Sequence, residues 1–272
     1  MSTTPDPPAV DVAIVNWNTP EAAGASARAF LASTDVTPRL TVIDNDSAAD
    51  AKAELESRLP AQARLILSQA NLGFGAGANL ALRDGDAELV CVSNADVVPE
   101  PGALAALAEA SAERRDAGMV GPAFADESAY HARLPSPGAL ALRPLIGGFR
   151  HRSVRSPGNG SCIEVGQPAG ACFLMRRRTW EQVGGFDEGF FLWYEDVDLA
   201  RRLRDAGLRN YVCGAAVVSH RGGLAADSMS DAERQAARLA GLRRYLEKHH
   251  PRTGRLSAPL FALGQRLRVG RS

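Results

Sequence analysis

The chain has 272 residues, 45% of them hydrophobic, which is enough to form one large α/β domain or a domain with a small appended unit. Its 31 Lys and Arg residues balance its 31 Asp and Glu residues, so the formal net charge is zero and the pI is near 7.0. This balance gives no electrostatic support for a nucleic-acid partner.

The first half of the chain alternates between predicted strands and predicted helices. Short apolar runs predict strands at residues 10–15, 40–43, 64–67 and 89–92, and the intervening or following segments predict helices at 20–32, 50–58, 76–83 and 101–117. Such alternation indicates a mostly parallel sheet with helices on both faces. Ligands bind these sheets beyond the carboxyl ends of the strands, so the polar residues there are the first candidates for a site.

Three polar clusters follow predicted strands and are expected to share one rim of the sheet. They are Asn16-Trp17-Asn18, Asp44-Asn45-Asp46 and Ser93-Asn94-Ala95-Asp96. Asp96 should project from the rim, where Mg²⁺ or Mn²⁺ can be held by one or two carboxylates and the oxygens of a substrate diphosphate. Asp44 can accept hydrogen bonds from a base or a ribose. Either aspartate can instead be only a turn residue.

A glycine-containing segment, residues 71–79, precedes the third predicted helix and contains Asn71 and Asn79. Gly73 and its neighbouring glycines permit close approach of a ligand to the backbone. Their spacing matches neither GxGxxG nor GxxxxGK[ST], so it predicts neither a dinucleotide-binding fold nor a P-loop. A tight turn from strand to helix explains the segment as well as ligand contact does.

The second half begins with a predicted strand at residues 119–124, followed by a weakly periodic stretch from 126 to about 166. We interpret this stretch as a long loop or a small insertion, a kind of segment that often binds ligands. Regular structure is predicted again as strands at 169–176 and 211–219 and as helices at 179–183, 195–203 and 231–248. The last strand delivers His220, whose imidazole can bind a metal.

An acidic segment follows the aromatic run that contains Phe190, Phe191, Trp193 and Tyr194. Its acids, at positions 195, 196 and 198, fall in the first turn of the predicted helix. Acidic first turns are common, and Asp198 can pair with Arg202 one turn later. The aromatic run favours catalysis instead, because excluding water raises the basicity of a nearby carboxylate.

The two ends of the chain and the cysteines bear on location. Residues 1–10 lack the basic start and apolar stretch of a signal peptide, and no later apolar run is long enough to span a bilayer. The cysteines are scattered, and Cys91 and Cys172 lie in apolar runs typical of buried strands. We therefore expect a cytoplasmic protein with reduced thiols. The arginine-rich end, from Arg234 onward, is either a solvated tail or a contact with an anionic surface.

Taken in order, these segments resemble the family 2 glycosyltransferases with the GT-A fold, especially the bacterial branch of rhamnosyltransferases and galactofuranosyltransferases. The resemblance covers roughly residues 10–223. It rests on Ile14-Val15-Asn16-Trp17-Asn18, Val42-Ile43-Asp44-Asn45, Asn71-Leu72-Gly73-Phe74-Gly75-Ala76-Gly77-Ala78-Asn79, Ser93-Asn94-Ala95-Asp96, Gly170-Ala171-Cys172-Phe173-Leu174-Met175-Arg176-Arg177, Gly184-Gly185-Phe186-Asp187-Glu188 and Glu195-Asp196-Val197-Asp198-Leu199, followed by His220.

The resemblance assigns roles to individual positions. It implies substrate binding by Val15, Asn16, Trp17, Asp44, Asn71, Gly73, Asn79, Asn94, Ala95, Trp193 and Glu195, with Asp44 contacting the nucleotide base. It implies that Asp96 and His220 hold Mn²⁺ or Mg²⁺, where Asn94 replaces the first acid of the family's DxD motif. It implies that Asp196 is the general base of an inverting transfer.

The resemblance also implies a domain organisation and partners. We expect a GT-A domain at residues 1–230, with a donor-binding half at about 10–125 and an acceptor and catalytic half at about 166–223, and then a C-terminal helix and basic tail at 231–272. The expected donor is dTDP-rhamnose or a UDP-sugar. The expected acceptor is a cell-envelope glycan or lipid-linked sugar, reached by peripheral contact of the tail with the inner membrane face.

Several alternatives remain open on the sequence alone. The enzyme can be a galactofuranosyl or other UDP-sugar transferase, or a glycosyltransferase of natural products. A nucleotidyltransferase would need an early glycine-rich loop with a basic residue, and residues 14–19 contain none. A binding module without activity would be marked by loss of Asp96 or Asp196, and both are present.

Overall fold

The computed structural model describes residues 6–125, 134–135, 157 and 160–252. The strands are β1 (Ala9–Asn16), β2 (Thr37–Asp44), β3 (Arg64–Leu67), β4 (Leu89–Asn94), β5 (Val97–Pro99), β6 (Ala117–Phe124), β7 (Cys162–Val165), β8 (Cys172–Arg176) and β9 (Arg209–His220). The helices are α1 (Pro20–Leu31), α2 (Ala49–Arg58), α3 (Phe74–Leu82), α4 (Ala103–Glu113), α6 (Arg177–Val183), α7 (Glu195–Asp205), α8 (Leu224–Asp227) and α9 (Asp231–His249).

The described strands form one mixed sheet in the order β3-β2-β1-β4-β8-β6-β9-β5, and β7 pairs with β9 beside this path. Strands β1 to β4 are mutually parallel where they pair, and β6 is parallel to β9. Strand β8 lies between these two parallel groups and is antiparallel to both β4 and β6. It therefore joins the first half of the chain to the second.

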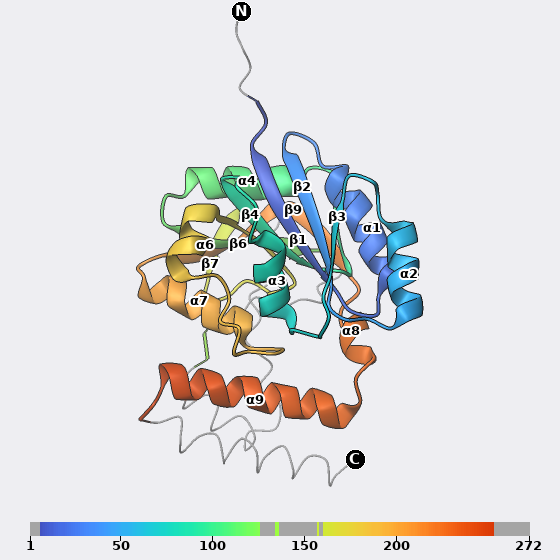
Figure 1. The fold of residues 1–272 in the computed structure, drawn as a ribbon. Helices are drawn as coiled ribbons and strands as arrows, with labels where there is room; N and C mark the ends of the chain where they lie inside the picture. The colour runs from blue at the N-terminus through green and yellow to red at the C-terminus, as the bar shows by residue number, and fades with distance from the viewer. Residues whose placement is uncertain (1–5, 126–133, 136–156, 158–159, 253–272) are drawn as a thin grey trace, which may run out of the picture.

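Helices cover both faces of the sheet. One apolar core packs α1, α2 and α4 against it through side chains such as Phe30, Leu55 and Leu107. A second core packs α3, α6 and α7 against the other face through Leu82, Trp180 and Leu203. Figure 1 looks onto this second face. The apolar runs of the central strands are continuous rather than alternating because both of their faces are buried.

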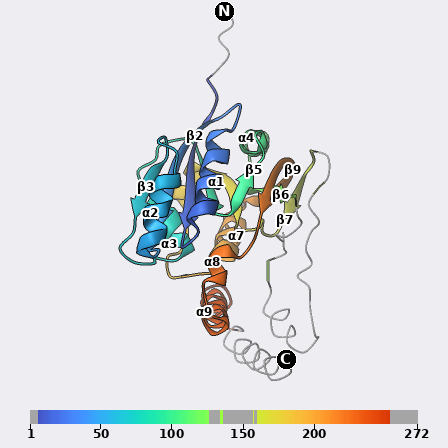
Figure 2. The same cartoon turned by 90° about the vertical axis from the view of Figure 1, so that its right-hand side faces the viewer.

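The carboxyl ends of β1, β2 and β4 point toward α8 and α9 (Figure 1). Figure 2 shows α8 leading from the sheet to α9, which lies below the body of the domain. The start of α9 is fixed by a capping box, in which the Ser230 hydroxyl accepts a hydrogen bond from the Glu233 N–H and the Glu233 carboxylate accepts one from the Ser230 N–H.

Most elements expected from the sequence are present, including the mostly parallel sheet and the C-terminal helix. Strands β5 and β7 and helix α8 were not expected. Strand β7 falls in the stretch 126–166 that we interpreted as a loop, and most of the rest of that stretch lies outside the described residues. With only four residues, β7 is too short to show the alternation of apolar and polar residues by which a strand is predicted. Helix α4 is shorter than expected at both ends.

A buried ion pair joins β1 to the start of α6, close to the amino ends of β1 and β4. The Arg177 guanidinium lies 2.6 Å from the Asp11 carboxylate, and both side chains are at most 12% exposed. Asp11 also accepts a hydrogen bond from the Ala87 N–H, and Arg177 donates one to the Ala87 carbonyl. Asp11, Arg177 and the Ala87 backbone thus satisfy one another's hydrogen-bonding groups. Removal of either charged side chain leaves the other charge buried without its partner.

We expect Arg177→Met to lower the free energy of unfolding by about 3 kcal/mol, because it leaves the Asp11 carboxylate buried without its cation. The matched control is Arg64→Met, which breaks an exposed pair with Asp84 and should cost less than about 1 kcal/mol. Urea denaturation followed by circular dichroism measures both. Equal losses in the two variants would contradict the structural role of the buried pair.

Candidate active site

A cavity of about 770 Å³ opens at the carboxyl ends of β1 and β4. Of the residues predicted from the sequence, those that line it are Val15, Trp17, Asn71, Gly73, Asn94, Ala95, Asp96, Trp193 and His220. Helices α8 and α9 form the opposite wall with side chains that include Met229, Ala236 and Ala237. The C-terminal helix is thus part of the cavity wall.

Asp96 and His220 face each other across the β5–β9 strand pair. His220 Nε2 lies 3.2 Å from Asp96 Oδ1 and 3.4 Å from the side-chain nitrogen of Asn94. Val97 pairs directly with His220 in the antiparallel register, which explains why residues far apart in the sequence meet here. Both side chains are about nine-tenths buried and line the cavity.

Asn16 and Asp44 lie beneath the cavity rather than in its wall. Both are fully buried, and the Asn16 amide donates a 2.9 Å hydrogen bond to Asp44 Oδ1. The Asp44 carboxylate also accepts hydrogen bonds from the Ser47 N–H and hydroxyl, at 2.9 and 2.6 Å. Asp44 therefore forms the turn that the sequence left open as an alternative. Its contact with a nucleotide base stays a prediction.

The glycine segment is shaped by close packing. Gly73 has a φ of 84°, and a Cβ atom there would lie 2.1 Å from the Phe191 carbonyl oxygen. The Asn45 side chain fixes the turn by donating to the Gly73 carbonyl and accepting from the Leu72 N–H. Gly73 therefore needs to be glycine because of protein contacts, although it also lines the cavity.

Asn79 lies on α3 and does not line the cavity. Its amide group donates hydrogen bonds to the Phe186 carbonyl and the Glu188 carboxylate, and its oxygen accepts one from the Phe186 N–H. Asn79 thus holds the turn that precedes the acidic segment. Its predicted role in substrate binding stays a prediction.

The acidic pair Glu195 and Asp196 forms the start of α7. Asp196 packs against the segment that leads into β8. Asp196 accepts hydrogen bonds from the Gln167 side chain, at 2.7 Å, and from the Val197 N–H, at 2.8 Å. A Cβ atom on Gly170 would lie 2.6 Å from Asp196 Oδ2. The backbone just before β8 is therefore in close contact with this carboxylate. The next residue, Ala171, accepts a hydrogen bond from the Asn94 N–H. A short piece of backbone therefore separates the cavity rim from Asp196.

Burial changes the acidity of both members of this pair. Burial, and then the charge of Asp196, raises the pKa of Glu195 to about 8. Among the described residues, Glu195 Oε2 has no hydrogen-bond partner. Burial also raises the pKa of Asp196, against the hydrogen bonds from Val197, Gln167 and Gly170 that stabilise its charged form. A carboxylate of raised pKa can accept a proton near neutral pH.

The backbone before this pair is strained. Trp193 and Tyr194 have φ values of 64° and 74°, in a region that residues other than glycine seldom adopt. Helix α9 holds this turn in place: a Cβ atom on Gly241 would lie 2.4 Å from the Trp193 carbonyl oxygen, and the Arg238 guanidinium lies 4.6 Å from the centre of the Trp193 ring.

The third acid, Asp198, is fully buried and anchors α9. Its carboxylate lies 2.7 Å from Arg202 Nε, 2.9 Å from Lys248 Nζ and 2.7 Å from His249 Nε2. Burial opposes ionisation, but hydrogen bonds from His249, Lys248 and Arg202 hold the pKa of Asp198 below its usual range. The pairing of Asp198 with Arg202 expected from the sequence is confirmed.

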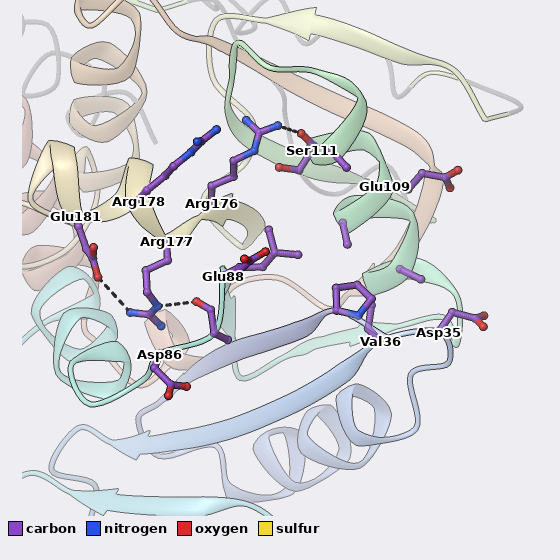
Figure 3. Close-up of a pocket in the computed structure, with 16 residues that line it drawn as sticks. Asp35, Val36, Asp86, Glu88, Glu109, Ser111, Arg176, Arg177, Arg178 and Glu181 are labelled. Atoms are coloured by element: carbon purple, nitrogen blue, oxygen red, sulfur yellow. Dashed lines mark hydrogen bonds and ion pairs between the residues drawn. The ribbon is translucent and has the colours of Figure 1, made fainter. Parts of the chain in front are cut away.

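A second cavity, of about 820 Å³, lies at the amino ends of β1, β2 and β4 (Figure 3). Two of its three arginines have structural partners, while Arg178 is exposed. Arg176 donates to the carbonyl oxygens of Ser111 and Arg114 on and after α4, and Arg177 belongs to the buried ion pair with Asp11. These two cations are used inside the protein, and the described lining of this cavity has no aspartate–histidine pair like that of the first cavity.

Sequence reasoning found the strand-end and acidic residues and missed others. Gln167, which binds Asp196, stands in a segment without periodicity, and nothing in its neighbours marks it. The cavity wall formed by α8 and α9 was also missed. The sequence of an amphipathic helix shows that one face is apolar but does not show which part of the protein that face packs against. The division of the domain into donor and acceptor halves stays a prediction.

The pKa of Glu195 predicts a pH dependence of stability. Between the ordinary glutamate pKa of 4.5 and the folded-state pKa of about 8, the folded protein keeps a proton that the unfolded chain releases. The free energy of unfolding should therefore fall as the pH rises through this window. Glu195→Gln removes the dependence, so we expect its stability relative to the wild type to increase by about 1 kcal/mol or more from about pH 5 to about pH 8.

Urea denaturation of both proteins at each pH measures this change. Glu56→Gln, at an exposed position on α2, is the matched control and should follow the wild-type profile. Parallel curves for the wild type and Glu195→Gln would contradict the raised pKa.

The chain is similar in sequence to known rhamnosyltransferases. The chain is 34% identical over 200 residues to the N-acetylglucosaminyl-diphospho-decaprenol L-rhamnosyltransferase of Mycobacterium tuberculosis, a match that spans 65% of each protein. It is 46% identical over 41 residues to rhamnosyltransferase WbbL of Escherichia coli, which covers 15% of this chain and 16% of that one. No described helix is long and apolar enough to cross a membrane.

The fold is also found among solved structures. A structure of GalNAc-T7 with UDP, GalNAc and Mn²⁺ matches 80% of this chain and 44% of its own chain, with a TM-score of 0.53 and 13% identity. This supports the GT-A-like arrangement of the sheet and its helices. A family model described as glycosyltransferase like family 2 matches residues 7–241. Because the match covers most of its length, the chain belongs to glycosyltransferase family 2.

Proposed function

We propose that this glycosyltransferase moves rhamnose from dTDP-rhamnose to a hydroxyl group of a lipid-linked glycan, with inversion at the anomeric carbon and with a divalent metal ion. The observation that carries the proposal is the cavity at the rim of the sheet. It has Asp96 and His220 together in one wall, with Asp196 behind the adjoining backbone. The choice of rhamnose rests on the two rhamnosyltransferases among the relatives.

The residues around Asp96 fit a divalent metal ion. Mg²⁺ and Mn²⁺ sites in phosphate-binding enzymes commonly use one or two protein ligands and fill the remaining positions with water and phosphate oxygens. Asp96 Oδ1 and His220 Nε2 supply two ligands 3.2 Å apart. The described lining residues of the cavity include neither lysine nor arginine. A bound metal ion would supply the positive charge that lets a nucleoside diphosphate leave.

The donor would lie along the strand ends. Val15 and Trp17 at the end of β1, and Asn71 and Gly73 before α3, line the cavity and are the proposed contacts with the nucleotide. Asn16 and Asp44 would act from below, because their mutual hydrogen bond fixes the positions of the two strand ends. The Asp44 carboxylate already accepts three hydrogen bonds, from Asn16 and Ser47, so a base contact would use its remaining acceptor site.

Asp196 is the proposed general base. It would take the proton of the acceptor hydroxyl as that oxygen attacks the anomeric carbon from the face opposite the diphosphate. One displacement inverts the anomeric centre and needs no nucleophilic carboxylate, unlike the two-step route of retaining glycosidases. The hydrogen bond from Gln167 would aim the carboxylate. Glu195, whose pKa of about 8 keeps it largely protonated at neutral pH, would act as a neighbouring hydrogen-bond donor.

The far wall of the cavity suits a lipid-linked acceptor. Trp193, Leu224, Met229 and the alanines of α9 are apolar, and Phe191 beside them is 47% exposed. An apolar wall next to a diphosphate site favours an acceptor that joins a lipid to a sugar through phosphate. The basic tail from residue 253 onward lies outside the described residues, and its contact with anionic lipid remains part of this proposal.

A screen of sugar nucleotides for release of nucleoside diphosphate tests the donor. We expect dTDP-rhamnose with Mn²⁺ and a polyprenyl-diphosphate-linked sugar to give the fastest release, and vesicles of anionic lipid to increase it over neutral ones. Faster turnover with a UDP-sugar would replace the proposed donor with the galactofuranosyl-type alternative. Equal rates with a lipid-free acceptor would contradict the lipid-linked one.

Two substitutions separate binding from chemistry. Asp196→Asn should lower kcat by about 10²-fold to 10⁴-fold while donor binding is kept, because the amide cannot accept the proton. Asp96→Ala should instead weaken metal-dependent donor binding, measured by calorimetry with and without Mn²⁺. Asp205→Asn, farther along α7, is the control and should keep wild-type kinetics. Near-normal kcat in Asp196→Asn would refute the assignment of the base.

A third substitution tests the contact between Gly170 and the proposed base. Gly170→Ala places a Cβ atom 2.6 Å from Asp196 Oδ2, so the carboxylate has to move. We expect about a 10²-fold loss of kcat, with donor binding within about twofold of the wild type. Gly102→Ala is the control, because nothing lies within 4 Å of a Cβ atom there. An unchanged kcat in Gly170→Ala would show that the exact position of Asp196 does not matter.

A further inference from the structure

Two of the four cysteines face each other across an antiparallel strand pair. Cys162 on β7 is directly opposite Cys213 on β9. The next pair outward, Ser161 and Gly214, is joined by a hydrogen bond from the Gly214 N–H to the Ser161 carbonyl. Hydrogen-bonded and non-hydrogen-bonded pairs alternate along such a ladder. Cys162 and Cys213 therefore form a non-hydrogen-bonded pair.

This register suits a disulfide bond. Opposite residues of a non-hydrogen-bonded pair have Cα atoms about 4.5 Å apart, and disulfides span Cα separations of about 4.4–6.8 Å. The Cys213 thiol lies close enough to Cys162 to contribute to the raised pKa of the Cys162 thiol. Cys162 is only partly buried, at an edge strand, while Cys213 is buried in the core beneath it. The Cys162 sulfur is therefore accessible to a reagent, and the buried Cys213 sulfur lies next to it.

We propose that Cys162 and Cys213 are a disulfide-forming site that reacts with low-molecular-weight disulfides. The Cys162 thiolate attacks one sulfur of the reagent and releases one thiol, which gives a mixed disulfide. The Cys213 thiolate then attacks the Cys162 sulfur and releases the second thiol. Two electrons pass from the protein to the reagent, and the two protons of the protein thiols end on the released thiols.

The reaction is expected to be slow at neutral pH. Burial and the neighbouring Cys213 raise the pKa of Cys162 to about 12, so little thiolate is present. A thiolate of high pKa also leaves slowly, so the bond should resist reduction once it has formed. The site is thus suited to a lasting cross-link. This cross-link would close the chain between β7 and β9 into a loop that contains Gln167 and the acidic pair.

The other two cysteines are a built-in contrast. In the β4–β8 pair, Cys91 is opposite Leu174 and Cys172 is opposite Ser93. The two cysteines are therefore diagonal neighbours, for which a Cα separation of about 7–8 Å is usual, beyond the usual span of a disulfide. Their thiols also interact, since Cys172 raises the pKa of Cys91, so the contrast rests on the register and on burial. Both are also fully buried. They should stay reduced in the folded protein.

The experiment incubates the whole native chain with oxidised glutathione at mildly alkaline pH, blocks free thiols and maps the peptides by mass spectrometry. We expect a cross-link between Cys162 and Cys213, with Cys91 and Cys172 recovered as free thiols. The oxidised protein should unfold at a temperature higher by on the order of 5 °C, and a reductant should reverse the shift. A native chain that reacts only after unfolding would overturn the proposal.

Two variants identify the order of events. Cys213→Ala should accumulate the mixed disulfide on Cys162, because the second thiol is missing. Cys162→Ser should form neither the cross-link nor the mixed disulfide and should show no shift in unfolding temperature. A stable mixed disulfide on Cys162 in the wild-type protein, without the cross-link, would contradict the proposed geometry. So would a lower unfolding temperature after cross-linking, since it would indicate a strained bond.

Discussion

The contact between the backbone at Gly170 and the Asp196 carboxylate is the constraint on which the site depends. Strand β8 begins two residues after this glycine and runs antiparallel to β4, so the same piece of chain meets Asn94 on one side and Asp196 on the other. Any side chain at position 170 would separate them. The distance between the cavity rim and the acidic pair is therefore set by backbone packing, which is stiffer than a contact between side chains.

The sequence was sufficient to predict the layered α/β fold and the clusters at the strand ends, because apolar runs and strand-end polar residues are local signals. The local pattern alone did not separate Glu195, Asp196 and Asp198, and only the resemblance to the family gave Asp196 and Glu195 different expected roles. Their differences come from distant residues: Gln167 beside Asp196, and His249 and Lys248 beside Asp198. Asp44 was identified by its place in the chain, but its burial under Asn16 and Ser47 depends on how two strands and a turn pack.

Electrostatics divide the three acids by their surroundings. Asp198 is surrounded by cations and stays charged, while Glu195 lies where no cation offsets burial and keeps its proton to about pH 8. Asp196 stands between these extremes, with hydrogen-bond donors but no arginine or lysine among its described hydrogen-bond partners. A general base needs to be ionised before the reaction and must not be so strongly stabilised in that form that it no longer takes up a proton. These surroundings support the proposal that Asp196 is the base.

Helix α9 extends the folded domain beyond the region that matches the family model. The match to the family model stops at residue 241, in the middle of α9, yet Tyr245 and Leu246 are buried and Lys248 and His249 contact the Asp198 carboxylate. A protein shortened to the matched region would keep every predicted ligand and base. It would lose two of the partners of a buried charge two residues from the proposed base, together with part of the core that supports the strained turn at Trp193. The functional boundary of this domain thus extends beyond the region by which its family is recognised.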